Sequence, residues 1–227
     1  MKNKNYGILN LNFIDRIIEN KRLEIFNVIK KKIDNKKIIS FLDIGTTEEK
    51  KLKSSNFFVK QFDYITIKKS ITNQNFENKN FSNILKKSIT SNFTLEEIEK
   101  FKSDLVISSA TIEHVGNFNS QLKMINNIIL LTKNFFFITT PNRSFPIDFH
   151  TKLPLIHMLP KKLHRKILNL LSLKEFAKEE NLNLLNIKEI NKMLKHLNFR
   201  GFEIEIFNIK LLGIASNLII MGKKINS

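Results

Sequence analysis

The sequence predicts an α/β protein in which helices cover both faces of a doubly wound, mostly parallel sheet of seven strands. Short apolar runs alternate with segments of helical periodicity, as strands and crossover helices do in such sheets. The last two apolar runs, 202–209 and 214–221, have a connection too short for a crossover helix, so this pair is expected to be antiparallel. The chain of 227 residues, 42% of them hydrophobic, fits a single domain over 1–227.

The first half of the chain supplies the first helix and three strands. Isoleucines share one face of a predicted helix over 12–34, which forms an N-terminal extension at 1–35. The apolar run at 38–42 is a buried strand that ends in a tight turn at 43–45. Three shorter elements follow: strands at 64–67 and 83–85, and a helix opened by a capping box at 94–97.

The second half continues this alternation. Strands are expected at 104–109 and 135–140, with a helix over 118–132 between them. An irregular stretch with helical pieces then covers 142–185. A helix over 187–197 precedes the final pair, and Gly201 stands where a left-handed C-terminal cap of that helix is expected.

Lysine dominates the charge of the chain. There are 38 Lys and Arg against 21 Asp and Glu, a net charge of +17, yet only five of the cations are arginine. Recognition of phosphates and bases favours the planar arginine side chain. We interpret the excess mainly as compositional, because Asn, Ile and Phe, which also have A/T-rich codons, are abundant as well. Nucleic acid is therefore disfavoured as a partner, and a polyanion or an anionic membrane surface is the alternative.

Several absences narrow the possible functions. The chain has no cysteine, which excludes a disulfide framework, a thiolate zinc site and a cysteine nucleophile. Its basic N-terminus lacks the apolar stretch of a signal peptide, and no run of about 20 apolar residues is present. We expect a soluble, cytoplasmic protein with no obligate protein partner.

Polar residues follow three of the predicted parallel strands. They are the stretches 43–48, 108–115 and 139–150. In open parallel sheets the ligand binds outside the carboxyl ends of the strands, at the point where the strand order reverses. These stretches together predict a site at that edge, although Asp43-Ile44-Gly45 taken alone also fits a plain turn.

The same stretches resemble a known family. Phe41-Leu-Asp-Ile-Gly45, Asp104-Leu-Val-Ile-Ser-Ser-Ala-Thr-Ile-Glu-His-Val115 and Thr139-Thr-Pro-Asn-Arg143 are similar to motifs of class I S-adenosylmethionine-dependent methyltransferases. The resemblance covers roughly 38–222 and points to the broad group that includes quinone-biosynthesis methyltransferases. Residues 141–150 also resemble a bacterial subgroup linked with modification of cell-surface sugars or lipids. A Rossmann-like fold is implied.

The resemblance implies S-adenosyl-L-methionine as cofactor and a role for each matching residue. The residues implied to bind the cofactor are Asp43, Gly45, Thr46, Ser88, Ser109, Ala110 and Glu113. The residues implied to line the acceptor side are Asn142, Arg143 and Asp148, with 142–185 as an insertion or lid above them. The implied reaction is methyl transfer to a small-molecule or lipid-linked sugar acceptor.

The chain departs from the family pattern at three places. Thr46 and Thr47 stand where further glycines are usual. The predicted second strand ends at 67–70 without the acidic residue that binds the ribose, so Thr72 or Asn73 would have to replace it. The third strand shows Ser88 in place of an aspartate. The missing glycines and acidic residue also disfavour a nicotinamide enzyme. A non-catalytic relative with a weakened pocket and an RNA methyltransferase stay open as alternatives.

Two of the five histidines are candidate catalytic residues. His114 and His150 each follow a strand end, where imidazole could serve as a general base. We favour His150, because apolar neighbours would keep its ring neutral. Asp148, two positions earlier, either accompanies this histidine or points away from it and holds the loop. For His114 the alternative is packing at a helix N-terminus, with Glu113 on the helix dipole. No histidine pair has metal-ligand spacing, so no metal site is expected.

The other histidines and the stretch 154–173 are assigned structural roles. His157 is expected to be packed, His164 to lie on a solvated basic face, and His196 to lie at the surface. Leucines at 163, 170 and 171, together with Ile167, share one helical face of the stretch. This helix could be a lid over the acceptor or rest on anionic lipid, and packing on the sheet is the simpler alternative.

Overall fold

The computed structural model describes residues 12–33, 37–48, 56–75 and 77–225. Within these residues, seven strands form one sheet in the order β3-β2-β1-β4-β5-β7-β6. Their bounds are β1 Ser40–Ile44, β2 Ile67–Thr72, β3 Asn83–Lys86, β4 Ser103–Ser109, β5 Thr132–Pro141, β6 Phe202–Leu211 and β7 Ile214–Lys224. β1 to β5 pair in parallel, and β7 is antiparallel to both β5 and β6. The predicted fold class and the antiparallel final pair are therefore confirmed.

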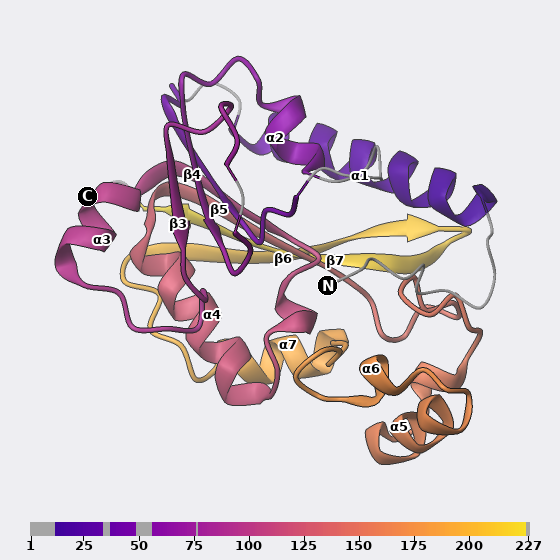
Figure 1. The fold of residues 1–227 in the computed structure, drawn as a ribbon. Coiled ribbons are helices and arrows are strands. Elements are labelled where there is room, and N and C mark those ends of the chain that lie inside the picture. The colour runs from indigo at the N-terminus through magenta and orange to yellow at the C-terminus, as the bar shows by residue number, and fades with distance from the viewer. Residues whose placement is uncertain (1–11, 34–36, 49–55, 76, 226–227) are drawn as a thin grey trace.

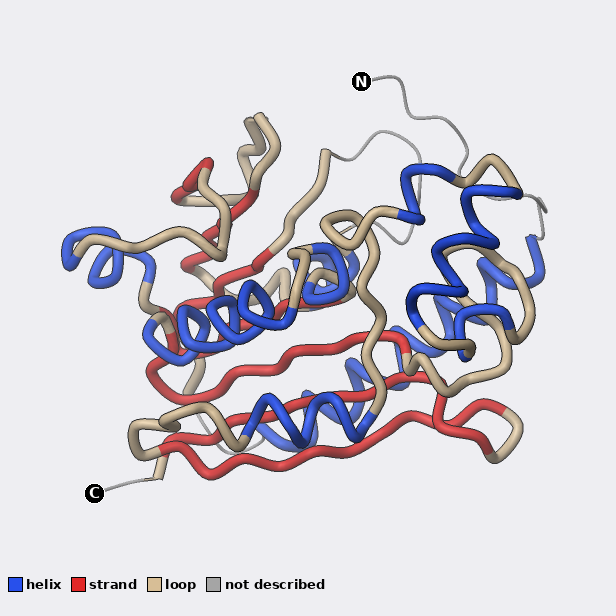
Figure 2. Tube along the Cα trace, turned by 90° about the horizontal axis from the view of Figure 1, so that it is seen from below, coloured by secondary structure: helices blue, strands red, loops and turns tan. Residues whose placement is uncertain are grey.

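Helices cover both faces of this sheet (Figure 1). One face is covered by α1 Asn12–Ile33 and α2 Phe57–Gln61, and the other by α3 Leu95–Phe101, α4 Phe118–Leu130 and α7 Ile187–Leu194. Two short 3-10 helices are η1 Ile112–His114 and η2 Ile156–Met158, and α5 Lys161–Leu170 and α6 Lys174–Ala177 lie off the sheet (Figure 2). No helix of the described residues is long and apolar enough to cross a membrane.

The central strands are buried on both sides, which explains their nearly continuous apolar runs. Phe135 and Phe137 of β5 face the cluster under α1 and α2, whereas Phe136 and Ile138 face the cluster under α4 and α7. The ring of Phe136 also requires a glycine beside it, because a Cβ at Gly222 would lie 2.0 Å from its Cε1.

Several element boundaries differ from the predictions; β1, for example, covers Ser40–Ile44 rather than 38–42. β2 begins at Ile67 rather than at Tyr64, which is 65% exposed, because 62–65 form a turn closed by the Ile65 N–H donating to the Phe62 carbonyl. α7 ends at Leu194, so Gly201, with φ +79°, opens the turn into β6 instead of capping the helix. β5 runs from Thr132 through Pro141 instead of stopping before the proline.

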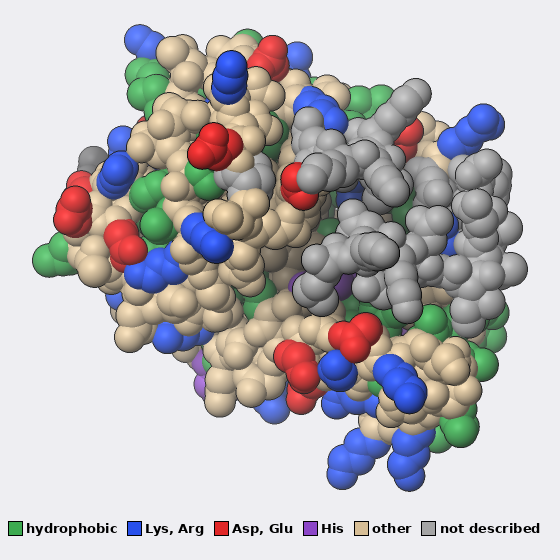
Figure 3. Space-filling view, viewed as in Figure 1, with side chains coloured by type: hydrophobic (Ala, Val, Ile, Leu, Met, Phe, Trp, Pro, Cys, Tyr) green, Lys and Arg blue, Asp and Glu red, His purple; other side chains and the backbone are tan. Residues whose placement is uncertain are grey.

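The face of α5 that was predicted to be buried is not the one that packs against the protein. Leu168 and His164 are buried, whereas Leu163 and Leu170 are 45% and 84% exposed. Burial of the His164 ring lowers its pKa to about 4, so it is neutral at physiological pH. Lys and Arg side chains project from the region of α5 in Figure 3.

Candidate active site

The end of β1 and the turn that follows it are joined by a network of polar side chains. Asp43 is buried, and its Oδ2 accepts a hydrogen bond of 2.5 Å from Thr46 Oγ1. Ser70 Oγ donates to Thr46 Oγ1 at 2.7 Å, and Thr72 Oγ1 donates to the Thr46 carbonyl at 2.7 Å. Burial raises the pKa of Asp43 to about 6, and the bond from Thr46 only partly offsets this rise. Neutral hydroxyls from the end of β2 thus fix the turn.

Gly45 allows the ends of β1 and β4 to approach closely. Its φ is +91°, and a Cβ there would lie 2.3 Å from Thr111 Oγ1. The Thr111 hydroxyl donates to the carbonyls of Ile44 and Ser109, at 3.3 and 3.2 Å. The glycine therefore makes room for a side chain of this protein, which the sequence motif alone did not indicate.

The end of β4 turns sharply toward η1. Ala110 has φ +51°, an uncommon conformation for a residue with a Cβ. Its N–H donates to the Thr139 carbonyl at 2.9 Å, and Thr139 Oγ1 donates to Ser109 Oγ at 3.1 Å. Ser88, beyond β3, shares a hydrogen bond of 2.8 Å with Thr90 within its own turn. Cofactor binding by these residues stays a prediction.

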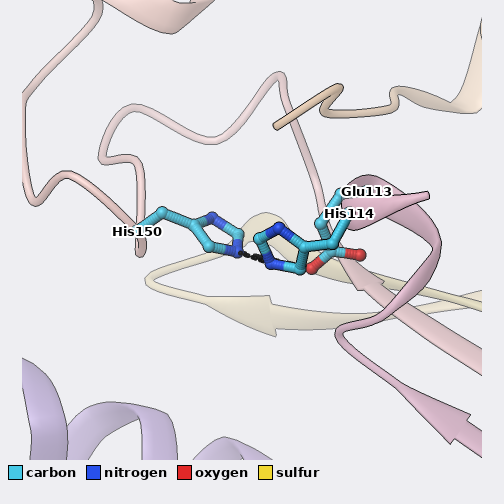
Figure 4. Close-up of side chains that lie close together, drawn as sticks. All are labelled: Glu113, His114 and His150. Atoms are coloured by element: carbon cyan, nitrogen blue, oxygen red, sulfur yellow. Dashed lines mark hydrogen bonds and ion pairs between the residues drawn. The ribbon is translucent and has the colours of Figure 1, made fainter. Parts of the chain in front are cut away.

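Glu113, His114 and His150 come together where β4 and β5 end (Figure 4). Glu113 is completely buried, and its Oε2 accepts a hydrogen bond of 2.9 Å from Thr140 Oγ1. Its Oε1 has no hydrogen-bond partner among the described residues and lies 3.5 Å from His150 Nε2. The Nε2 atoms of His114 and His150 are 3.1 Å apart. The two rings meet edge to face, with centroids 4.9 Å apart.

The second nitrogen of each imidazole has its own partner. His114 Nδ1 lies 2.6 Å from the Asn181 carbonyl oxygen, so it carries the proton and leaves Nε2 as the acceptor. His150 Nδ1 lies 3.2 Å from Oδ1 of the buried Asp148, which also accepts from Thr151 Oγ1 at 2.6 Å. The side chain of Asp148 therefore faces His150 and does not point away from it.

The charges of the cluster follow from these contacts. Burial disfavours a charged His150, but its hydrogen bond to Asp148 and the attraction of the Glu113 carboxylate, 3.5 Å away, outweigh this penalty and raise the pKa of His150 to about 10. Asp148 and Glu113 are buried too, and His150 holds the pKa of each below its usual range. The surrounding protein partly desolvates the His114 ring and lowers its pKa, although part of this residue is exposed to solvent. His150 is thus a cation in this cluster, contrary to the expectation of a neutral ring.

Asn142 and Arg143 hold the segment after β5 in place. Asn142 Nδ2 donates to the Ala215 carbonyl at 2.8 Å. Arg143 donates to the carbonyls of His157 and Leu159, at 3.0 and 2.7 Å. A role of these two side chains in acceptor binding stays a prediction. His157 is packed as expected, with Nε2 2.7 Å from the Phe145 carbonyl.

Two surface cavities lie on the β2–β3 side of the sheet. One, of about 250 Å³, is lined by residues of α2 and by Asp63 and Lys68, and the other, of about 430 Å³, is lined by residues 74–86. Neither is lined by the cluster of Glu113, His114 and His150. The strand-end site is therefore identified by its side chains and not by the shape of a cavity.

Comparison with solved structures establishes the fold. The chain matches magnesium protoporphyrin IX methyltransferase from Synechocystis PCC 6803, with S-adenosylmethionine bound, at a TM-score of 0.52 and 11% identity, over 96% of this chain and 87% of that one. It matches small RNA methyltransferase HEN1 at a TM-score of 0.56 and 12% identity, over 91% of this chain and 25% of that one. A putative zinc-dependent alcohol dehydrogenase from Rhodobacter sphaeroides matches at a TM-score of 0.56 and 10% identity, over 87% of this chain and 89% of that one.

These likenesses give the chain the Rossmann-like fold of class I S-adenosylmethionine-dependent methyltransferases. They do not fix the reaction, because identities of 10 to 12% reflect the fold alone. No protein-family model matches the sequence, and a search of curated proteins finds no match.

Proposed function

We propose that this protein is an S-adenosylmethionine-dependent methyltransferase that acts on a hydroxyl group of a small-molecule or lipid-linked sugar acceptor. One observation carries the proposal: on a methyltransferase-type fold, a buried acidic turn and a histidine–carboxylate cluster occupy the carboxyl ends of neighbouring parallel strands. This is the edge at which such sheets bind their ligands.

The residues at the end of β1 fit the cofactor in part. The carboxyl group of Asp43 can accept a hydrogen bond from the ammonium group of the methionine half, and Ser109 and Thr139 add polar groups at the adjacent strand ends. The end of β2 offers only Thr72, whose hydroxyl already donates to Thr46. Any contact with the ribose would therefore be neutral, which predicts weaker binding than a carboxylate would give.

The cluster supplies groups that handle a proton. A bound cofactor would bring a methyl group already activated on sulfur, so the chain must align the acceptor oxygen and remove its proton. His114 Nε2 is the unprotonated nitrogen of the pair, and the charged His150 stands beside it with Asp148 and Glu113. We therefore assign the base to this histidine pair, with Asp148 as its positioning residue.

Titration calorimetry tests the proposal. We expect the full chain to bind S-adenosylhomocysteine with one site and to bind NAD much more weakly, because a pyrophosphate needs glycines that this turn lacks. Absence of S-adenosylhomocysteine binding at millimolar concentration would favour a non-catalytic relative of the methyltransferases.

An RNA acceptor is the second candidate. The net charge of +17 and the likeness to a small RNA methyltransferase support it. Compositional charge predicts weak binding that falls steeply with salt and shows no sequence preference. A tight complex with one RNA near physiological salt would promote this candidate above the small-molecule acceptor.

A further inference from the structure

We propose that Glu113, His114 and His150 form a binding site for one divalent transition-metal ion, with coordination positions left open for oxygen atoms of the acceptor. The metal site itself is independent of the reaction, whereas the role of the open positions rests on the proposed methyltransferase function. These three residues are the only His, Asp and Glu group of this kind among the described residues.

The spacing of the three candidate ligand atoms suits a single ion. His114 Nε2 and His150 Nε2 are 3.1 Å apart, and His150 Nε2 lies 3.5 Å from Glu113 Oε1. A metal at about 2.1 Å from each ligand requires separations of roughly 3.0 to 3.4 Å, depending on whether the angles are octahedral or tetrahedral. The third separation, between His114 Nε2 and Glu113 Oε1, is within 4.8 Å, so a closer approach of this pair would bring the three atoms onto one ion.

Glu113 Oε1 is the observation that points most directly to a ligand. It belongs to a completely buried residue and has no hydrogen-bond partner among the described residues. Its companion oxygen is held by Thr140, which fixes the carboxylate with Oε1 toward the histidines (Figure 4). A buried carboxylate oxygen without a donor is unfavourable, and a bound cation would remove that penalty.

The outer partners of the histidines are those of metal ligands. Metal-bound histidines commonly donate their second N–H to a carboxylate or a backbone carbonyl, which orients the ring. Here Asp148 takes this position for His150 and the Asn181 carbonyl takes it for His114. Both Nε2 atoms are thereby directed at the same point, beside Glu113.

Without a bound ion, a shared proton would hold the two imidazole rings together and balance the negative charge of the cluster. The two Nε2 atoms can share one hydrogen, which is the arrangement of a charged His150 donating to His114. Arg22 of α1 also interacts electrostatically with Glu113. A proton-bridged cluster is thus the competing description, and it predicts that no metal binds.

The ligand set selects the kind of metal. Two imidazoles and one carboxylate favour Zn²⁺, Co²⁺, Fe²⁺ or Mn²⁺ over Mg²⁺ and Ca²⁺, which prefer oxygen ligands. Three protein ligands leave at least one position for a hydroxyl or two neighbouring hydroxyls of an acceptor. The histidines then serve as ligands instead of bases, and the cation lowers the pKa of the hydroxyl so that its proton leaves to water.

Cobalt binding to the untagged full chain, freed of metal with a chelator, tests the site. We expect one equivalent of Co²⁺ to bind with visible absorption bands of a nitrogen- and oxygen-ligated ion. His114→Ala should weaken binding at least tenfold, and this partly exposed residue is the ligand whose removal disturbs folding least. His196→Ala, at an exposed histidine outside the cluster, should bind Co²⁺ like the parent protein.

Two results would overturn the proposal: no stoichiometric Co²⁺ binding, or equal affinity in His114→Ala and the parent while thermal unfolding shows both to be folded. Titration of the same metal-free protein with S-adenosylhomocysteine separates the two proposals. Cofactor binding without Co²⁺ binding removes the metal site alone, and Co²⁺ binding without cofactor binding removes the methyltransferase function alone.

Discussion

The two halves of the strand-end edge differ in how their polar groups are satisfied. At β1 and β2, the carboxyl group of Asp43 accepts a hydrogen bond from the Thr46 hydroxyl, which in turn accepts one from Ser70. At β4 and β5, buried charges face one another, and one oxygen of Glu113 has no hydrogen bond within the described residues. The β1–β2 half thus has a fixed arrangement, which suits a cofactor that must be held in one orientation, whereas the β4–β5 half has groups that can exchange protons or ligands. Changes in each half should therefore have different consequences.

The largest expected effect on stability is in the β1–β2 half of the edge. Gly45→Val forces a side chain into a left-handed conformation and against Thr111, and we expect a loss of about 2–5 kcal/mol in the free energy of unfolding. Gly213→Val is the matched control, because φ there is +80° and no atom lies within 4 Å of a new Cβ. Urea unfolding should show about 1–3 kcal/mol for this control. Equal losses would mean that the Thr111 contact is unimportant.

The pH dependence of stability should separate the two halves. The folded-state pKa of Asp43 is raised to about 6, so its contribution favours folding at low pH and is lost between about pH 4 and 6. The pKa of His150 is raised to about 10, so its contribution is complete below about pH 6.5 and is lost as the pH rises toward 10. Urea unfolding across this range measures both.

Single substitutions test which residue causes the loss of stability in each of these two pH ranges. Asp43→Asn should flatten the loss between pH 4 and 6, and His150→Asn should flatten the loss between pH 6.5 and 10. If either variant left its range unchanged, the corresponding pKa shift would not be located at that residue.

A smaller difference in stability is expected between losing a hydrogen bond to a charged group and losing one between neutral groups. Thr140→Val removes the donor to Glu113 Oε2, which we expect to cost about 1.5–3 kcal/mol because the acceptor is a buried carboxylate. Thr139→Val removes only a donor to Ser109 Oγ and should cost about 0.5–1.5 kcal/mol. Chemical denaturation of the two variants in parallel makes the comparison, and the reverse order would contradict the assigned charge of Glu113.

The sequence patterns predicted which edge of the sheet carries the polar site, but not which side chains meet there. The parallel strands and their polar ends were predictable because burial on both faces leaves continuous apolar runs that stop at Asp43 and Ser109. The contact of His114 with His150 was not, because the residues are 36 positions apart and meet only after two neighbouring strands pair. For the same reason, the spacing argument against a metal site did not apply to this cluster.

Local patterns also misplaced two features. The apolar alternation at Tyr64-Ile-Thr-Ile suggested a strand, but Ile65 is buried as part of a turn that precedes β2. The basic residues around His164 suggested a solvated face, yet the opposite side of the same short helix packs inward and carries this histidine. In both cases tertiary packing decided which of two plausible faces is buried.

The central claim is that the β1–β2 half of the edge, with Asp43, binds the cofactor and the β4–β5 half, with Glu113, His114 and His150, binds the acceptor. Calorimetric titration with S-adenosylhomocysteine of the parent protein, Asp43→Ala and His150→Asn tests it most directly. We predict that Asp43→Ala loses affinity at least tenfold, or about 1.4 kcal/mol, while His150→Asn stays within about threefold of the parent, or roughly 0.7 kcal/mol. Equal affinity in all three proteins, or a loss confined to His150→Asn, would contradict this division.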